Sequence, residues 1–211
     1  TSFTDLDISF LDELPPGRLP VQTIVLSDHR RPEVIERVRA TCTQQKQVYW
    51  VCPLIEESDL QHYQAAETTF KTLKADLTDL RLGLIHGRLP SAEKERIMRD
   101  FKNGAIDLLV ATSVIEVGVD VSSANLIVIE NAERLGLAQL HQLRGRVGRS
   151  ETKGFCILLY QTLSPLAKER LGIMRNSNDG FMIAQRDLEL RGPGEIWGLR
   201  QTGWKQLRIA D

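Results

Sequence analysis

Short apolar runs recur along the chain, and segments with apolar positions at helical spacing separate several of them. The apolar runs predict β-strands, at residues 23–26, 47–52, 82–85, 107–111, 126–129 and 155–160. The helical spacing predicts α-helices, at residues 32–43, 59–77 and 91–101. Strands that alternate with helices indicate crossover units, so the expected fold class is α/β with a mainly parallel sheet.

The runs expected in the middle of this sheet lack polar alternation. LLVA at 108–111 and LIVI at 126–129 are apolar throughout, as in strands that helices cover on both faces. In open parallel sheets the ligand-binding surface lies beyond the carboxyl ends of the strands. We therefore expect the working loops at residues 86–87, 112–120 and 131–135.

The segment 91–101 carries clear helix signals. We expect Ser91 to cap its first turn, because a serine hydroxyl can accept a hydrogen bond from a free backbone N–H there. We expect Asn103 and Gly104 to end the helix, since both residue types tolerate the backbone conformation of a helix stop.

The pattern changes at both ends of the α/β segment. Prolines at 15, 16 and 20 disfavour regular structure near the start. After Tyr160, two helices are expected, at 164–175 and 179–189, and a glycine-rich stretch follows. We therefore divide the chain into a linker, an α/β domain, and a helical hairpin with a loop, at residues 1–20, 21–160 and 161–211.

Composition excludes few classes. The net charge of −1 gives no global basic signal, although a local basic patch would be hidden in this average. The three cysteines are widely spaced and the four histidines lack ligand spacing, so we expect no zinc site, no other metal site and no disulfide framework. A reducing cytoplasm fits this cysteine usage, and we expect Cys52 and Cys156 to be core residues.

Membrane and secretion signals are missing from the sequence. No apolar stretch approaches the ~20 residues of a membrane span, so we expect no membrane partner. The chain begins without Met, in TSFTDLDISF, and we interpret it as a fragment of a longer protein.

The strongest chemical signal is QLRGRVGR, residues 142–149. Arg146 and Arg149 have a spacing that would bring both onto one face of a helix. The rigid guanidinium fork suits phosphate oxygens, so the pair predicts two phosphate clamps, one acting as an arginine finger. Spacing alone leaves a solvated basic helix as an equal alternative.

A second signal, ATSVIEVGVD at 111–120, follows an apolar run. Hydroxyls at a strand end beside free N–H groups suit a phosphate, and ordinary helix capping is the alternative. Asp120 could reach a ribose hydroxyl or an arginine. A third signal, His86-Gly87-Arg88, is weak alone, because a single histidine at a strand end is more often structural.

Together these segments carry a resemblance. In order and spacing, IHG, ATSVIEVGVD and QLRGRVGR resemble motifs IV, V and VI of the second RecA-like domain of superfamily 2 helicases, a P-loop NTPase-like three-layer fold. YWVCPLIEESD (49–59) and SNDGFMIAQRDLELRGPGEIWGLRQTG (177–203) resemble a bacterial family of ATP-dependent DNA helicases that remodels branched DNA. The second stretch looks like a translocation motif that this family shares with the transcription-repair coupling factor, which is the closest alternative.

The resemblance implies roles at the nucleotide. Arg149 matches the arginine finger of motif VI, and Arg146 matches its partner on the γ-phosphate. Gln142 matches the residue that couples nucleotide to the domain interface. Gly118 and Asp120 match motif V positions near the ribose.

The resemblance also implies roles at the DNA. Thr112 matches the motif V contact to the backbone of the tracking strand. The translocation motif suggests Arg170, Arg191 and Gln201 as polar groups that link the helical hairpin to the loop after it. Trp197 and Trp204 have either a packing role or a base-stacking role in that loop.

One departure concerns the nucleotide-binding elements. The sequence contains no G-x-x-x-x-G-K-[ST] loop and no DExH box, which in this family belong to the first motor domain. The implied cofactor, ATP with Mg²⁺, would be held mainly by that domain. The implied partners are branched or duplex DNA, and a wedge domain and first motor domain in the same protein. We expect this chain alone to be inactive, and a non-catalytic DNA-binding module is the competing hypothesis.

Overall fold

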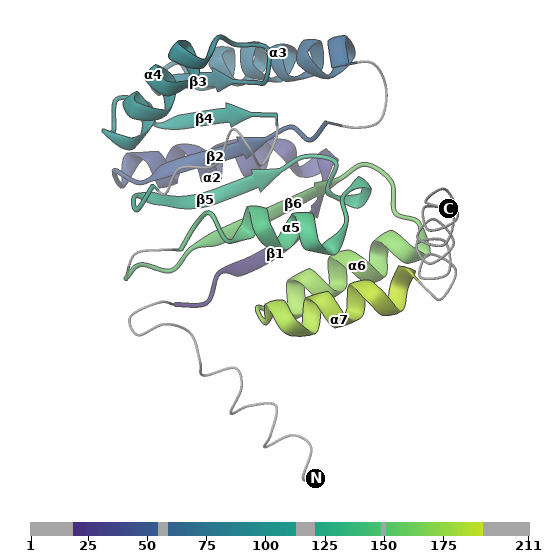
Figure 1. Ribbon diagram of the computed structural model, residues 1–211. Helices are drawn as coiled ribbons and strands as arrows, with labels where there is room; N and C mark the ends of the chain where they lie inside the picture. Colours follow the sequence, from purple (N-terminus) through teal and green to yellow (C-terminus); the bar gives the residue numbers. More distant parts are fainter. Residues whose placement is uncertain (1–18, 55–58, 113–120, 149–150, 192–211) are drawn as a thin grey trace, which may run out of the picture.

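A six-stranded sheet forms the centre of the computed structural model, which describes residues 19–54, 59–112, 121–148 and 151–191 (Figure 1). The strands lie in the order β1-β6-β5-β2-β4-β3, and every neighbouring pair is parallel. Their bounds are β1 Gln22–Ser27, β2 Gln47–Val51, β3 Leu82–Ile85, β4 Leu108–Ala111, β5 Ala124–Ile129 and β6 Phe155–Tyr160. All the strands predicted from the sequence are confirmed, and so is the parallel α/β fold class.

Helices cover both faces of this sheet and make a three-layer domain. Their bounds are α2 Arg31–Thr43, α3 Asp59–Asp76, α4 Ser91–Lys102, α5 Leu137–Arg144, α6 Pro165–Asn176 and α7 Gly180–Arg191, with short 3₁₀ helices η1 Asp28–Arg30 and η2 Ala132–Arg134. One apolar core lies between the sheet and helices α2 and α3. The other lies between the sheet and helices α4, α5, α6 and α7.

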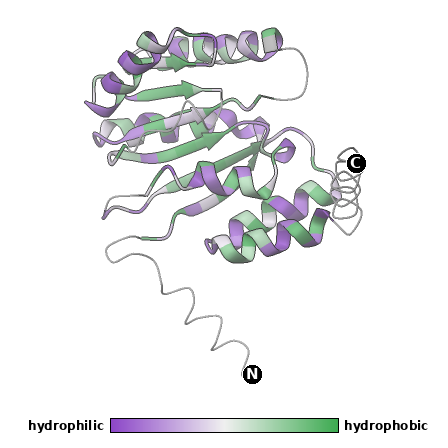
Figure 2. Ribbon diagram, in the orientation of Figure 1, coloured by the Kyte–Doolittle hydropathy of each residue, from purple (hydrophilic) through white to green (hydrophobic). Residues whose placement is uncertain are grey.

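The strand β2 contributes side chains to both cores. All its residues are buried, and successive side chains point to opposite faces of the sheet. Val48 and Trp50 therefore enter the core under α2 and α3, whereas Tyr49 and Val51 enter the core under α4 and α5. Figure 2 is consistent with this burial, since the strands are largely hydrophobic and the helices mix hydrophilic and hydrophobic residues.

The ends of α4 test two predictions. The expectation that Ser91 caps this helix is wrong, because Ser91 is already its first helical residue and Pro90 occupies the cap position without a side-chain hydrogen bond. The Pro90 carbonyl accepts from the N–H groups of Glu93 and Lys94 instead. The predicted stop is confirmed, with Asn103 at the C-cap and Gly104 in the left-handed region at φ 81°.

The two helices after β6 lie side by side next to β1 (Figure 1). Ser164 caps α6, where its hydroxyl accepts from Ala167 N at 3.1 Å. Leu171, Met174 and Ile183 join the same apolar core as α5, so the hairpin packs on the α/β layers. The division of the chain near residue 161 remains a prediction.

Candidate functional site

The strands β3, β4 and β5 end at the same edge of the sheet, which we call the carboxyl edge, because all the strands are parallel (Figure 1). Thr112, directly after β4, is 1% exposed, and its hydroxyl has no hydrogen-bond partner among the described residues. Together with Pro53, Gln139 and Leu143 it lines a hollow of about 210 Å³ beside α5. The rest of the motif V segment, including Gly118 and Asp120, lies outside the described residues, so its nucleotide role stays a prediction.

The helix α5 leads away from this edge, since it belongs to the crossover from the carboxyl end of β5 to the amino end of β6. Gln142 is exposed on α5. Arg146 is half-buried in the turn that follows the helix. Arg149 lies outside the described residues.

The backbone after α5 corrects one step of the motif VI argument. The sequence hypothesis placed Arg146 and Arg149 on one helical face. However, α5 ends at Arg144, and Gly148 adopts the left-handed conformation at φ 74°. A Cβ on Gly148 would also lie 2.7 Å from Val21 Cγ2, so the chain passes close to the start of β1. Any pairing of the two arginines on a phosphate therefore depends on a turn.

The first arginine of the same motif, Arg144, is a residue whose role the sequence analysis missed. It is 3% exposed, and its guanidinium donates to Thr23 Oγ1 at 3.2 Å and to two backbone carbonyls. A sequence signal was present, because Arg144 follows Leu137 and Leu140 at helical spacing and so falls on the apolar face of α5.

Around His86, the structure forms an aromatic and basic cluster. The His86 Nδ1 accepts from Arg88 N at 3.2 Å, and the imidazole is largely buried. The Tyr63 ring lies 5.0 Å from the His86 ring, and the Arg88 guanidinium lies 5.3 Å from the Tyr63 ring centre. The histidine therefore has a structural role in its turn, and Tyr63 is a neighbour that the sequence analysis did not identify.

Arg170 and Arg191 have short-range partners. Arg170 Nη2 donates to Glu133 O at 2.6 Å and joins α6 to η2, while its buried Nε has no partner. Glu133 Oε1 accepts from Gln161 N at 3.2 Å, and Oε2 is buried without a partner. Arg191 pairs with Asp187 at 3.0 Å within α7. Gln201 and the loop after α7 lie outside the described residues, so the proposed link from hairpin to loop stays a prediction.

A network of ion pairs at the carboxyl edge joins the start of α2 to the end of β5. Arg31 on α2 pairs with Glu130 after β5 and with Asp28 at 3.3 Å. Trp50 Nε1 donates to Glu130 Oε1 at 3.0 Å. Burial alone would lower the pKa of Arg31, but the two carboxylates outweigh it and raise the pKa.

Within the described residues, no group of three or more His, Cys, Asp or Glu side chains could hold a metal ion. None of the described helices is long and apolar enough to cross a membrane. The cysteines are free and buried, and burial raises the pKa of both Cys42 and Cys156 to about 12. Cys52 and Cys156 are confirmed as core residues.

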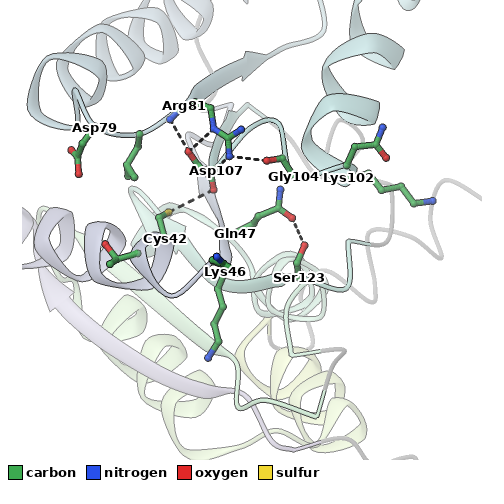
Figure 3. Close-up of a pocket in the computed structure, with 13 residues that line it drawn as sticks. Cys42, Lys46, Gln47, Asp79, Arg81, Lys102, Gly104, Asp107 and Ser123 are labelled. Atoms are coloured by element: carbon green, nitrogen blue, oxygen red, sulfur yellow. Dashed lines mark hydrogen bonds and ion pairs between the residues drawn. The ribbon is translucent and has the colours of Figure 1, made fainter.

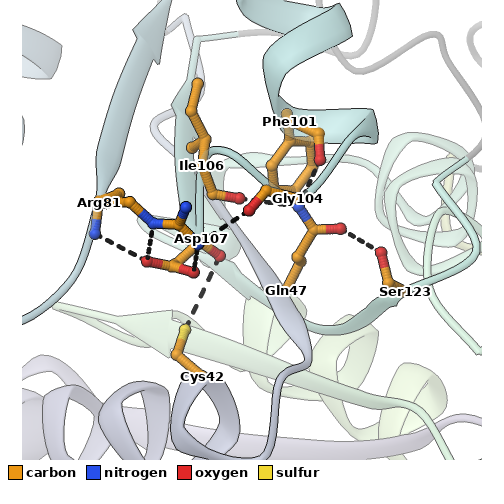
Figure 4. A network of polar contacts seen from close by, with 8 residues as sticks. All are labelled: Cys42, Gln47, Arg81, Phe101, Gly104, Ile106, Asp107 and Ser123. Carbon is orange, nitrogen blue, oxygen red and sulfur yellow. Dashed lines mark hydrogen bonds and ion pairs between the residues drawn. The ribbon is translucent and has the colours of Figure 1, made fainter.

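A larger hollow, of about 670 Å³, lies where the strands of the sheet begin, which we call the amino edge (Figure 3). Several polar groups of its lining pair with one another (Figure 4). Arg81 binds Asp107 through its backbone N–H at 2.8 Å and its guanidinium at 2.9 Å, and Gln47 bonds to two carbonyls and to Ser123. None of the described residues that the motifs single out lines this hollow.

Residues 31–151 match the model of the helicase conserved C-terminal domain. The whole chain is 59% identical to ATP-dependent DNA helicase RecG of Escherichia coli O157:H7, of which it covers 31%. It is 47% identical to RecG of Thermotoga maritima over 99% of the chain and 27% of that protein. A solved structure of RecG bound to a three-way DNA junction matches 87% of the chain and 24% of the RecG chain, at 47% identity and a TM-score of 0.74.

These similarities confirm the expected resemblance to a bacterial family of DNA helicases and the RecA-like fold. The relatives from Escherichia coli and Thermotoga maritima are RecG proteins, so the resemblance to this family is confirmed. The chain spans 31% of the length of the Escherichia coli relative that it matches.

Proposed function

The chain belongs to the helicase conserved C-terminal domain family, and from this premise we propose that it is the second motor domain of an ATP-dependent DNA helicase. In this proposal a first motor domain holds ATP and Mg²⁺. This chain adds Arg146 and Arg149, whose charges stabilise the γ-phosphoryl group during transfer. Gln142, Gly118 and Asp120 contact the nucleotide side of the same cleft.

The observation that supports this proposal best is the course of α5. Gln139 and Leu143 of this helix line the hollow of Thr112, and its last turn leads into Arg146. The Thr112 hydroxyl is buried without a partner among the described residues, and such a group gains free energy when it meets an acceptor. A DNA phosphate oxygen would supply that acceptor. One helix would then join the DNA contact to the ATP contact.

We propose branched DNA as the substrate, because the chain resembles RecG along its whole length and a RecG structure was solved on a three-way junction. ATP turnover would alternately close and open the cleft between the two motor domains. Thr112, the hairpin and the proposed translocation residues Arg170, Arg191 and Gln201 would then shift along the duplex backbone.

A comparison of the chain alone with the complete protein tests this function. We expect negligible ATP turnover from residues 1–211, because the phosphate-binding loop is absent from this sequence. The complete protein should turn over ATP when branched DNA is added. Turnover by the chain alone would contradict the proposal.

A second candidate is a non-catalytic module that grips DNA without nucleotide. Its support is the absence of a phosphate-binding loop in this sequence. It predicts that ATP and its analogues leave the DNA affinity of the complete protein unchanged. The motor proposal predicts a nucleotide-dependent affinity. Titration of DNA at several salt concentrations, with and without a non-hydrolysable ATP analogue, separates the two.

A further inference from the structure

Three side chains from two parts of the chain meet just beyond the end of β3. His86 is the first residue after the strand, Arg88 lies in the turn that follows it, and Tyr63 lies near the start of α3. The Tyr63 ring centre lies 5.0 Å from that of His86, and the Arg88 guanidinium lies 5.3 Å from the Tyr63 ring centre. Tyr63 belongs to none of the three helicase motifs, so a helix outside the motifs contacts the turn after β3.

Hydrogen bonds to His86 fix the backbone of this turn. The His86 Nδ1 accepts from Arg88 N at 3.2 Å, and the His86 carbonyl accepts from Leu89 N at 3.2 Å. His86 is 8% exposed, so the turn is anchored in the domain. Arg88, by contrast, is exposed. The turn therefore presents the arginine to the outside from a fixed backbone position.

The Tyr63 ring restrains the exposed guanidinium without using its hydrogen-bond donors. An arginine can place its flat face on an aromatic ring while the N–H groups at its edge still reach a phosphate. Within the described part of the chain, Arg88 contacts this ring and forms no ion pair with a carboxylate. A long side chain that is already held in place loses less conformational freedom on binding, so its affinity for a phosphate is higher.

This cluster lies next to Thr112 at the carboxyl edge. The strands β3 and β4 are neighbours, and Ile85 pairs with Ala111, so the residues that follow, His86 and Thr112, leave the sheet at the same level (Figure 1). Neighbouring strands are only about 4.8 Å apart. A DNA strand with one phosphate at the Thr112 hydroxyl would therefore bring its neighbouring phosphate within reach of the long Arg88 side chain.

We propose that Tyr63 is a positioning residue for DNA binding, because its ring holds Arg88 against the phosphate next to the one at Thr112. This role rests on the proposed function, since it requires a DNA strand that runs along the carboxyl edge. Tyr63 touches the arginine and not the DNA. Its ring carries the effect, because a cation–π contact needs no hydroxyl.

The test is the affinity of the complete protein for a branched DNA at several salt concentrations, without nucleotide. We expect Arg88→Gln to weaken binding by about tenfold and to make the fall of log K with log salt shallower by about one unit, as for one lost phosphate contact. Tyr63→Leu should weaken binding by about threefold, because the cation–π contact is lost. Tyr63→Phe keeps the ring and should bind within about 1.5-fold of the wild type.

A double variant shows whether Tyr63 acts through the arginine. In the Arg88→Gln background, Tyr63→Leu should change the affinity by less than about 1.5-fold, because the contact that it would break is already gone. ATP turnover at saturating DNA should stay near that of the wild type in each single variant, whereas the DNA concentration for half-maximal turnover rises.

Lys74→Gln is the matched control. The Lys74 Nζ lies 5.9 Å from the Phe70 ring on the same helix, but it belongs to the last turn of α3, far from the turn after β3. This exchange also removes a cation from an aromatic ring, and it should change neither the affinity nor the salt dependence.

The positioning role is overturned if Tyr63→Leu binds like the wild type, or if Tyr63→Phe binds as weakly as Tyr63→Leu. It is also overturned if Tyr63→Leu weakens binding equally with and without Arg88. An unchanged salt dependence in Arg88→Gln would overturn the phosphate contact. Failure of the proposed function looks different, because the wild-type protein would then show no DNA-stimulated ATP turnover.

Discussion

The amino and carboxyl edges of the sheet differ in whether their buried polar groups have hydrogen-bond partners. At the amino edge, the Arg81 guanidinium donates to the Asp107 carboxylate, and the Gln47 amide donates to two backbone carbonyls (Figure 4). At the carboxyl edge, three buried polar atoms of the described residues have no partner, on Thr112, Glu133 and Arg170. Native proteins leave few such atoms unpaired, so a group of them at one edge needs an explanation.

The larger of the two hollows is not the one beside the hydroxyl that lacks a partner. The amino edge has a hollow of about 670 Å³, yet Gln47, Arg81 and Asp107 in its lining already have partners. The hollow at Thr112 is about 210 Å³, and the buried Thr112 hydroxyl has no partner among the described residues. We therefore propose structural work for the amino edge and ligand contact for the carboxyl edge.

The largest effect on stability is expected at Gln47. Its amide donates to Phe101 O and to Ile106 O, and its Oε1 accepts from Ser123. Gln47→Leu would remove all three bonds, and we expect the free energy of unfolding to fall by about 3 kcal/mol. Urea unfolding of the chain measures this.

Ser123→Ala is the control for that variant, because it removes only one of these bonds and should cost about 1 kcal/mol. The two variants should unfold in that order. A Gln47→Leu chain as stable as the wild type would show that the amino edge is not the structural one.

An intermediate effect on the free energy of unfolding is expected at Asp107, and it depends on pH. Burial pushes the pKa of this carboxyl up, but the hydrogen bonds and charge of Arg81 outweigh it and hold the pKa below its ordinary value of 3.8. The folded state therefore gains free energy from the ionised carboxyl above pH 3.8, and this gain is lost as pH falls through the lowered pKa. Asp107→Asn should be less stable than the wild type at neutral pH, and the difference should shrink in acid.

Asp79→Asn serves as the comparison, because Asp79 is about half exposed and its pair with Arg39 contributes little. Unfolding of the three proteins across acidic pH measures the differences. If the gap between wild type and Asp107→Asn stayed constant down to about pH 2, the Arg81 pairing would not be stabilising.

The smallest effect on stability is expected at Thr112. Thr112→Val removes a hydroxyl without a partner, so we expect the free energy of unfolding to change by less than about 0.5 kcal/mol. Thr23→Val is the matched exchange at a buried threonine whose hydroxyl accepts from Arg144, and it should cost about 1 kcal/mol.

In the complete protein, Thr112→Val should nevertheless reduce DNA-stimulated ATP turnover. A Thr112→Val protein with normal turnover would remove the functional difference between the two edges. A strongly destabilised variant would show that the hydroxyl has a structural partner.

Much of the fold was predictable because it depends on local patterns. Apolar runs such as LLVA at 108–111 identified each strand of the described residues, and the parallel order placed Thr112 at the carboxyl edge. The bonds of Gln47 were not predictable, because its partners lie 54 to 76 residues away. Burial of Arg144 could have been predicted from its place on the apolar face of α5, but its contacts with α6 are tertiary.

The roles of the site residues stay predictions, and the structure tests only the local backbone around the motif VI arginines. The motif spacing identified Arg146 and Arg149, but it suggested a shared helical face that Gly148 interrupts. A positive φ at a glycine depends on packing against Val21 and Gly154, which pattern reasoning does not include. The Ser91 cap failed for a similar reason, since the proline before it took the cap position.

ATP turnover in the complete protein carrying Arg146→Ala or Arg149→Ala is the most direct test of the account, with Arg99→Ala on α4 as the control. We predict that each finger variant still binds a non-hydrolysable ATP analogue, and that DNA-stimulated turnover falls by about 10³-fold or more. Arg99→Ala should keep normal turnover. Normal turnover in either finger variant would contradict the central claim that this domain supplies its arginine to the ATP.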